Sequence, residues 1–259
     1  MMNAAPTLDL RLRDGVAVVT LDRPPANALV PEMADLLDGV LTTLERSDDV
    51  GAVVFTSAGR FFSAGADVTV LAGFGATGSQ VVGFVEDLQR LFERLESLPV
   101  PSIAQIAGIA TGGGLELALA CDLRIASLSA KIGLPEVKLG LIPGAGGTQR
   151  LVDVAGRATA SRLILTGDLI SGQEAARQGI VHEAVDAAQL DLHVRRIAAG
   201  LAGHSRAAVA EAKRCLSLAR SDEGFRQELA ATERLLGSSD TQARLRAFLS
   251  SRATGGRDE

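Results

Sequence analysis

The sequence predicts an α/β protein in which a mainly parallel β-sheet is followed by a helical C-terminal region. Two observations support this prediction. Short apolar strands alternate with amphipathic helices up to Asp186, and only helical periodicity follows. With 259 residues and a hydrophobic content of 47%, the chain is long enough to bury a large core. We therefore place a core domain at residues 1–186 and a helical region at residues 187–259.

Each element follows from a local pattern. Residues 8–13 and 16–21 alternate apolar and polar side chains around Asp14-Gly15, a dipeptide typical of a hairpin turn. Helical spacing of apolar residues predicts helices over 31–45, 81–98 and 115–120, and short apolar runs predict strands over 52–56, 102–106, 123–126 and 180–185. The C-terminal helices are predicted over 190–201, 207–218, 225–236 and 241–250. The glycine-rich residues 73–79 form either a pocket lid or a surface loop.

Composition excludes several classes of function. A net charge of −5 argues against a general binder of nucleic acid or of anionic membranes. The chain has no Trp or Tyr, so recognition by indole or phenol stacking is excluded. Two distant cysteines fit a reducing cytoplasm better than a disulfide framework. No apolar run predicts a signal peptide or a membrane span, and we expect a cytoplasmic protein.

Three glycine-rich turns stand out at residues 63–67, 112–114 and 144–147. None has the glycine spacing of a dinucleotide-binding loop or the lysine ending of a phosphate loop, so a dehydrogenase or a nucleoside triphosphatase is poorly supported. The triple glycine lies between a strand and a helix, where unpaired N–H groups meet the positive end of the helix dipole. Such donors can form an oxyanion hole, and the turn at 64–67 is a candidate for the second donor.

Two carboxylates are candidates for acid–base chemistry. Glu116 lies in the first turn of the helix opened by the triple glycine, and Glu136 follows Leu134-Pro135 in a loop. Each has an ordinary alternative: Glu116 can stabilise a helix N-terminus, and Glu136 can be a solvated surface charge. The histidines lie far from the glycine turns in sequence, and no set of side chains has the spacing of metal ligands, so we expect no metal site.

Taken together, the motifs resemble those of the enoyl-CoA hydratase/isomerase (crotonase) family over nearly the whole chain. The residues that carry the resemblance are 23–29, 62–67, 109–117, 121–126 and 135–148. The resemblance implies a crotonase-like spiral of ββα units. It also implies a helical C-terminal region that forms trimers, which commonly stack into hexamers, and that completes the pocket for coenzyme A.

The family's catalytic residues carry over to matching positions. The resemblance implies that the N–H groups of Ala66 and Gly113 hold the thioester oxygen of an acyl-CoA. Glu116 would activate water, and Glu136 would exchange a proton with C2 of the acyl group. Further contacts to substrate or coenzyme A are implied for Ala26, Ala64, Asp67, Val68, Leu134, Gly144 and Phe248.

The implied activity is that of a 2-enoyl-CoA hydratase of fatty acid β-oxidation, which reversibly adds water to a trans-2-enoyl-CoA to give a 3-hydroxyacyl-CoA. Two fixed donors would stabilise the enolate oxygen, and two nearby carboxylates would share one proton. No cofactor is implied, because coenzyme A is part of the substrate. The expected partners are the acyl-CoA substrate and other copies of the chain, with neither nucleic acid nor membrane.

Some positions depart from the family pattern and leave alternatives open. Thr69 replaces a lysine that many relatives direct at the phosphate of coenzyme A. Leu134 replaces a polar glutamine, and Ala243-Arg244 replaces a common Glu-Gly pair. A 3-enoyl to 2-enoyl-CoA isomerase would use Glu136 alone, and a silent acyl-CoA-binding protein would be expected to lose a glutamate. RNA binding is disfavoured by the acidic charge balance.

Overall fold

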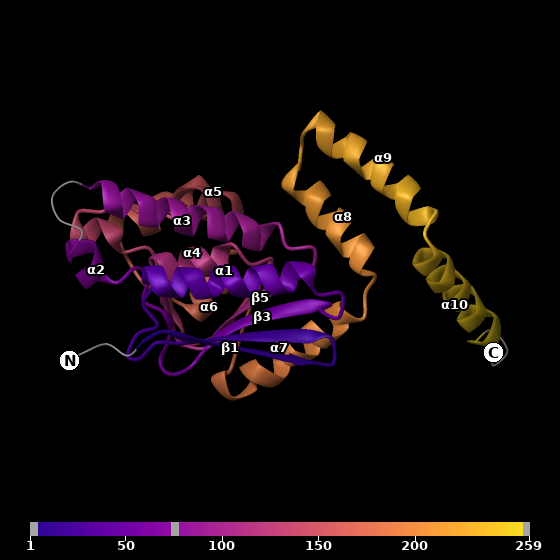
Figure 1. The fold of residues 1–259 in the computed structure, drawn as a ribbon, viewed down its shortest axis with the longest axis horizontal. Coiled ribbons are helices and arrows are strands. Elements are labelled where there is room, and N and C mark those ends of the chain that lie inside the picture. Colours follow the sequence, from indigo (N-terminus) through magenta and orange to yellow (C-terminus); the bar gives the residue numbers. More distant parts are fainter. Residues whose placement is uncertain (1–4, 74–77, 256–259) are drawn as a thin grey trace. The chain divides into compact units, whose positions relative to one another are not determined.

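The computed structural model describes residues 5–73 and 78–255, with side chains described as far as Arg252. It divides into two compact units, one ending at Ala202 and the other beginning at Gly203. The elements are labelled in Figure 1. None of the described helices is both long enough and apolar enough to span a membrane.

The larger sheet has six strands in the order β1-β2-β3-β5-β7-β10. The hairpin of β1 and β2 is antiparallel, and the remaining neighbours pair in parallel. The strands are β1 (Thr7–Arg13), β2 (Val16–Asp22), β3 (Ala52–Ser57), β5 (Ser102–Ile106), β7 (Leu123–Ser127) and β10 (Glu183–Val185). This arrangement confirms the hairpin and the mainly parallel sheet.

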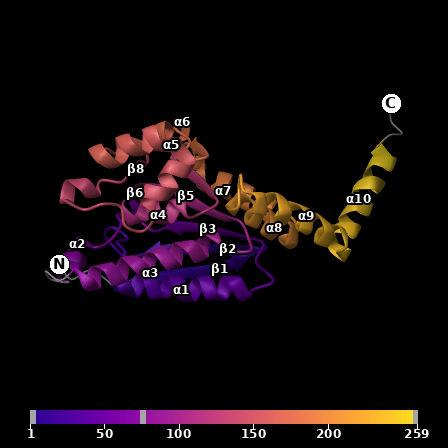
Figure 2. The same ribbon diagram turned by 90° about the horizontal axis from the view of Figure 1, so that it is seen from above.

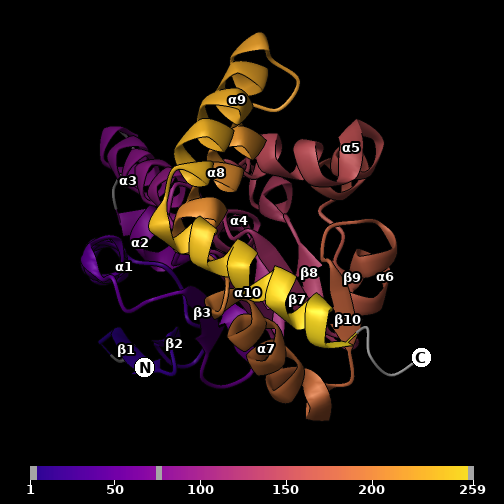
Figure 3. The same cartoon turned by 90° about the vertical axis from the view of Figure 1, so that its right-hand side faces the viewer.

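A second sheet is made of short strands in the order β4-β6-β8-β9. They are β4 (Phe61–Ser63), β6 (Ile109–Thr111), β8 (Lys131–Gly133) and β9 (Ile170–Ser171), and Figure 3 shows β8 beside β9 and β7 beside β10. From β3 to α5 the chain three times gives one strand to the large sheet, the next to the small sheet, and then forms helix. This repetition is the predicted spiral of ββα units. Strands of two or three residues are too short to produce a periodic pattern in the sequence.

Helices cover both faces of the large sheet. On one face lie α1 (Pro31–Arg46) and α3 (Ser79–Glu96), which run side by side in Figure 2. On the other face lies α7 (Ala187–Ala202). Successive residues of β3 point to opposite faces, so Val53 packs in the main core and Val54 packs under α7. Because α7 packs on this sheet, the first compact unit includes α7 and ends at Ala202.

The remaining helices of the first unit are α2 (Val68–Gly73), α4 (Gly113–Leu119), the 3₁₀ helix η1 (Glu136–Leu139), α5 (Gly147–Thr166) and α6 (Gly172–Arg177). The sequence analysis did not predict α5, which Gly156 interrupts with non-helical angles of φ 75° and ψ 160°. The predicted strand over 180–185 is shorter, because only Glu183–Val185 pairs with β7. Within the glycine-rich stretch 73–79, Gly73 ends α2 and Gly78 precedes α3, while 74–77 lie outside the described residues.

The second unit consists of α8 (Arg206–Ser217), α9 (Asp222–Leu236) and α10 (Ser239–Gly255). Ser221 caps α9 by accepting a hydrogen bond from the N–H of Gly224 at 3.0 Å. Large apolar side chains on these helices are exposed, namely Leu216, Phe225, Leu229, Leu236, Leu245, Phe248 and Leu249.

Candidate active site

The triple glycine lets a helix begin in direct contact with the backbone of β4. Gly112 precedes α4 with φ 54° and ψ −132°, a conformation that side chains strongly disfavour. A Cβ atom on Gly114 would lie 2.2 Å from the carbonyl oxygen of Ser63. The sequence therefore needs glycine here for backbone angle and for space. The first turn of α4 is consequently held against the end of β4.

The turn at residues 64–67 faces that helix start. Leu29 pairs with this turn by donating to Gly65 O at 2.8 Å and accepting from Asp67 N at 2.9 Å, so the N–H of Ala66 points the other way. Gly65 has φ +86°, and a Cβ atom on it would lie 2.7 Å from the nitrogen of Gly113. Neither Ala66 N nor Gly113 N donates to any of the described residues. Two adjacent N–H groups are thus available to one ligand oxygen.

A buried ion pair holds the turn in place. Arg23 donates to Asp67 Oδ2 at 2.9 Å, and both side chains are 8% exposed. Asp67 Oδ1 accepts from the hydroxyl of Thr69 at 2.6 Å and from its N–H at 3.0 Å. The Thr69 hydroxyl and the Arg23 guanidinium lower the pKa of Asp67. Asp67 therefore remains ionised and fixes the residues that flank Ala66.

Glu116 projects from the first turn of α4 but binds the start of a different helix. Its Oε1 accepts hydrogen bonds from the N–H groups of Ala145 and Gly147, each at 2.8 Å, and the residue is only 3% exposed. Burial raises the pKa of Glu116, and the two N–H groups and the Arg150 guanidinium oppose that rise. The carboxylate is thus oriented by the third glycine-rich turn, at 144–147.

Glu136 lies in η1 in a different environment. Its Oε2 is buried and has no hydrogen-bond partner among the described residues. A Cβ atom on Gly112 would lie 3.1 Å from its Oε1, which places the carboxylate beside the triple glycine. Burial raises the pKa of Glu136 to about 7, and the charge of Glu116 adds to the rise. Among the described residues, Glu136 Oε2 has no counterpart to the N–H groups of Ala145 and Gly147, which favour the ionised form of Glu116.

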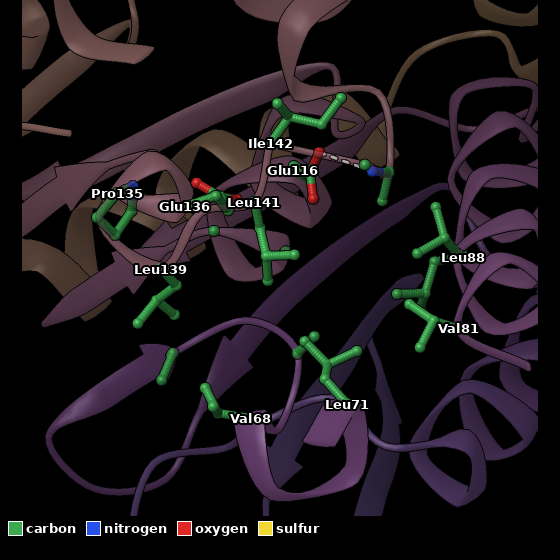
Figure 4. Close-up of a pocket in the computed structure, with 17 residues that line it drawn as sticks. Val68, Leu71, Val81, Leu88, Glu116, Pro135, Glu136, Leu139, Leu141 and Ile142 are labelled. Atoms are coloured by element: carbon green, nitrogen blue, oxygen red, sulfur yellow. Dashed lines mark hydrogen bonds between the residues drawn. The ribbon is translucent and has the colours of Figure 1, made fainter. Parts of the chain in front are cut away.

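One pocket contains both carboxylates and both N–H groups. Figure 4 shows Glu116 and Glu136 near one another, with Leu71 and Leu88 on other walls of the pocket. Including the part open to solvent, the space is about 790 Å³. Its aliphatic lining comprises Val68, Leu71, Val81, Val85, Leu88, Leu139, Leu141 and Ile142. The site can therefore hold an apolar group next to two acid–base residues and a pair of hydrogen-bond donors.

Comparison with known proteins assigns this arrangement to a family. A family model described as enoyl-CoA hydratase/isomerase matches residues 11–253. The chain belongs to the enoyl-CoA hydratase/isomerase family.

Relatives match over most of their length. A probable enoyl-CoA hydratase of Mycobacterium leprae is 39% identical over 95% of this chain and 96% of its own. A short-chain-enoyl-CoA hydratase of Clostridium acetobutylicum is 39% identical over 78% of this chain and 77% of its own. The crystal structure of an enoyl-CoA hydratase from Bacillus anthracis has a TM-score of 0.90 at 38% identity, covering 94% of this chain and 96% of that one. The crotonase fold predicted from the sequence is therefore confirmed.

Most of the residues implied by the hydratase/isomerase resemblance lie together. Those that line the pocket are Ala64, Ala66, Val68, Gly113, Glu116, Glu136 and Gly144. Three others, all in the first unit, do not line it. Leu134 is fully buried in the core, Asp67 pairs with Arg23, and Ala26 accepts a backbone hydrogen bond from Ala64 at 3.0 Å. Phe248 lies on α10 in the second unit, where the guanidinium of Arg252 is 5.1 Å from its ring centroid.

Sequence reasoning missed the aliphatic walls of this hydratase/isomerase pocket. Leu139, Leu141 and Ile142 follow Glu136 directly, and all three are exposed despite their apolar side chains. An apolar run in a loop next to a candidate carboxylate was the available signal. For Val81 and Val85 of α3, the helical pattern indicated a core face and could not distinguish a pocket wall from the core.

The pKa of Glu136 predicts a pH-dependent change in stability. In the folded protein this pKa is about 7, against 4.5 for the free side chain, so the folded state retains a proton that the unfolded state loses. The stabilisation of the folded state by this bound proton is fully present below pH 4.5 and is lost as pH rises through 7. Glu136→Gln has no proton to lose at this position, so its stability does not fall for this reason. Between pH 4.5 and 8 we expect the variant to gain about 1–3 kcal/mol of unfolding free energy relative to wild type, a range discounted for partial exposure.

Urea unfolding at several pH values measures this difference. The exposed Glu228 of α9 provides a control, since Glu228→Gln removes a carboxylate without removing a buried one. A Glu136→Gln curve parallel to that of wild type over the whole pH range would show that Glu136 ionises normally.

Proposed function

We propose that this chain is a 2-enoyl-CoA hydratase, acting in the cytoplasm on a trans-2-enoyl-CoA to give a 3-hydroxyacyl-CoA. The observation that carries the proposal is the pair of carboxylates, Glu116 and Glu136, which line one pocket with the N–H groups of Ala66 and Gly113. An isomerisation needs one acid–base group, whereas hydration needs a base for water and an acid for carbon. The second carboxylate therefore favours hydration.

The two N–H groups would bind the thioester oxygen. When water adds to C3, negative charge develops on that oxygen, and fixed donors stabilise it more than they stabilise the neutral carbonyl. In this chain the bridge between Leu29 and Ala66 orients one donor, and the start of α4 orients the other. The resulting enolate carries the electron pair that C2 then uses to accept a proton.

The environments of the carboxylates support a different role for each. Glu116, bound by two N–H groups and near Arg150, acts as the base: it takes a proton from water as the oxygen of that water bonds to C3. Glu136, which has a pKa of about 7 and no donor to Oε2 among the described residues, holds the proton that is delivered to C2. One proton is taken up and one is released, so a transfer from Glu116 to Glu136 restores the starting state. The proposed reaction needs no cofactor.

The test is an assay of the purified protein against 2-enoyl-CoA and 3-enoyl-CoA substrates of several chain lengths. Hydration consumes the conjugated enoyl absorbance, whereas isomerisation of a 3-enoyl-CoA creates it. We expect hydration to be the faster reaction. Faster isomerisation would replace the proposal with the isomerase, and binding of acyl-CoA without turnover in either direction would indicate a silent binding protein.

We also propose that the second unit mediates self-association into a trimer or a hexamer. Exposed side chains such as Phe225, Leu229 and Phe248 give it an apolar surface that is costly to leave in water. Light scattering at micromolar concentration should show the mass of three or six chains, and Leu229→Glu should shift it towards smaller species. A monomer under these conditions would contradict the proposal, while Glu228→Gln on the same helix should change nothing.

A further inference from the structure

The backbone of Ala145 connects Glu116 to a cationic side chain outside the pocket lining, through the N–H on one side of its Cα atom and the carbonyl on the other. Its N–H donates to Glu116 Oε1 at 2.8 Å, and its carbonyl oxygen accepts from Arg150 Nη1 at 2.9 Å. Arg150 lies on α5, one turn beyond Gly147, whose N–H is the other donor to Glu116. A single turn of chain is therefore held by Glu116 from one side and by Arg150 from the other.

Arg150 is itself fixed by a carboxylate from another helix. Its Nε and Nη2 donate to the two oxygens of Glu96, at the end of α3, at 2.7 and 2.8 Å. Its side chain is only 12% exposed. Gly146 has φ +100°, and a Cβ atom there would lie 1.9 Å from Arg150 Nη1, so glycine is what allows the guanidinium to lie against the turn. The bidentate pair leaves Nη1 directed at Ala145, a geometry that lysine cannot reproduce.

We propose that Arg150, held by Glu96, is a positioning residue for Glu116. Arg150 fixes the turn at 145–147, and the two N–H groups of that turn orient the catalytic carboxylate. The inference rests on the proposed function for the role of Glu116. Arg150 itself makes no contact with the substrate in this proposal. Its effect passes through the backbone of Ala145 and through its positive charge.

The charges around Glu116 define what loss of Arg150 should do. The positive charge of Arg150 lowers the pKa of Glu116, against burial, while Glu136 of η1 faces the same pocket. Glu96 and Glu93 of α3 act on Arg150 in turn. Without Arg150, Glu116 keeps its burial and loses a cation, so its pKa should rise. A base that ionises at higher pH moves the acidic limb of the rate profile to higher pH.

Three variants separate orientation from charge. Arg150→Met removes both, and we expect kcat for hydration to fall about 10- to 100-fold, with the acidic limb moved to higher pH and KM nearly unchanged. Arg150→Lys retains the positive charge but cannot form the bidentate pair with Glu96. The acidic limb of the pH profile should therefore return towards that of wild type, while kcat recovers only in part. Glu96→Gln weakens the bidentate pair and leaves Arg150 charged, so kcat should fall without a shift of the acidic limb to higher pH.

Arg94 provides a matched control. It lies on α3, whereas Arg150 lies on α5, and it too makes a bidentate pair, donating to Glu45 of α1 at 3.1 and 2.9 Å. None of the hydrogen bonds found for it among the described residues leads to Glu116. Arg94→Gln should lower thermal stability and leave both kcat and the pH profile unchanged. If folded Arg150→Met kept the acidic limb and kcat of wild type, or if Arg94→Gln gave the same shift, the proposal would be overturned.

A measurement without turnover keeps this inference separate from the hydratase proposal. In protein carrying ¹³C-labelled glutamate carboxyls, the Glu116 signal is identified by its absence in Glu116→Gln, and its titration is followed by NMR. The titration should move to higher pH in Arg150→Met and should stay in place in Arg94→Gln. A shift in a protein that hydrates no enoyl-CoA would support the positioning role and reject the hydratase. An unmoved titration in an active hydratase would reject the positioning role alone.

Discussion

Glu136→Gln and Glu116→Gln should each lower kcat for hydration by about 10²- to 10⁴-fold, the usual effect of removing a positioned acid or base. Glutamine retains the shape of the side chain but can neither take nor give the proton. Because the two carboxylates act as a unit in one reaction, the double variant should be little worse than either single one. Initial rates with crotonyl-CoA and a longer homologue measure the effect.

The two variants should differ in exchange at C2. Glu136→Gln should stop the exchange of a C2 proton of the 3-hydroxyacyl-CoA or of a saturated acyl-CoA with deuterated water. Glu116→Gln should retain part of that exchange while failing to add water. Near-normal hydration by Glu116→Gln, with isomerisation as the faster native reaction, would show that Glu136 acts alone and that the isomerase is correct.

The assignment of Glu136 as the acid also predicts how the activity of the wild type changes with pH. Glu136 must hold its proton to act as the acid, and its pKa is about 7, so kcat/KM should decline as pH rises above 7.

Sequence reasoning identified the chemistry of the site better than its walls. The triple glycine, the turn at 64–67, Glu116 and Glu136 all bear functional groups whose purpose can be inferred from residue type and order. The partner of Glu116 was not foreseen. The ordinary alternative to a catalytic role was that this carboxylate stabilises the start of its own helix, but its Oε1 binds the start of α5, 29 and 31 residues further on. Such a long-range contact has no local pattern.

Fold prediction failed where elements were short or interrupted. The strands of the small sheet have two or three residues, and their pairing depends on neighbours brought together by the spiral. The helix α5 contains Gly156 at φ +75°, which breaks its periodicity. Leu134 shows the limit of position matching, because its side chain is in the core although Pro135 and Glu136 beside it line the pocket.

Gly113→Val should abolish measurable hydration while leaving the protein folded. A Cβ atom on Gly113 would lie 3.5 Å from the nitrogen of Ala66, which is the other proposed donor to the thioester oxygen. Loss of one such donor typically costs about 3–4 kcal/mol of transition-state stabilisation. A branched side chain blocks both, so the loss in kcat should exceed about 10³-fold.

The fold should tolerate this change because the side-chain atom nearest to the added Cβ can move. The nearest atom to the added Cβ is Leu29 Cδ1 at 3.1 Å, the end of a flexible side chain, and Gly113 has no positive φ. Gly65→Ala is the contrasting variant. Its Cβ would lie 2.7 Å from Gly113 N and 2.8 Å from Thr111 O, on a residue with φ +86°, so it should lower thermal stability as well as activity.

Enoyl absorbance with crotonyl-CoA and longer homologues, followed for wild type beside Gly113→Val, is the decisive measurement, with circular dichroism to establish that both are folded. Free coenzyme A should still bind Gly113→Val, because the change is confined to the position of the thioester oxygen. Equal rates in the two proteins would show that the oxygen is bound elsewhere. Loss of activity with retained binding of coenzyme A would place the developing negative charge between Ala66 and Gly113, since only a ligand that reacts there depends on both N–H groups.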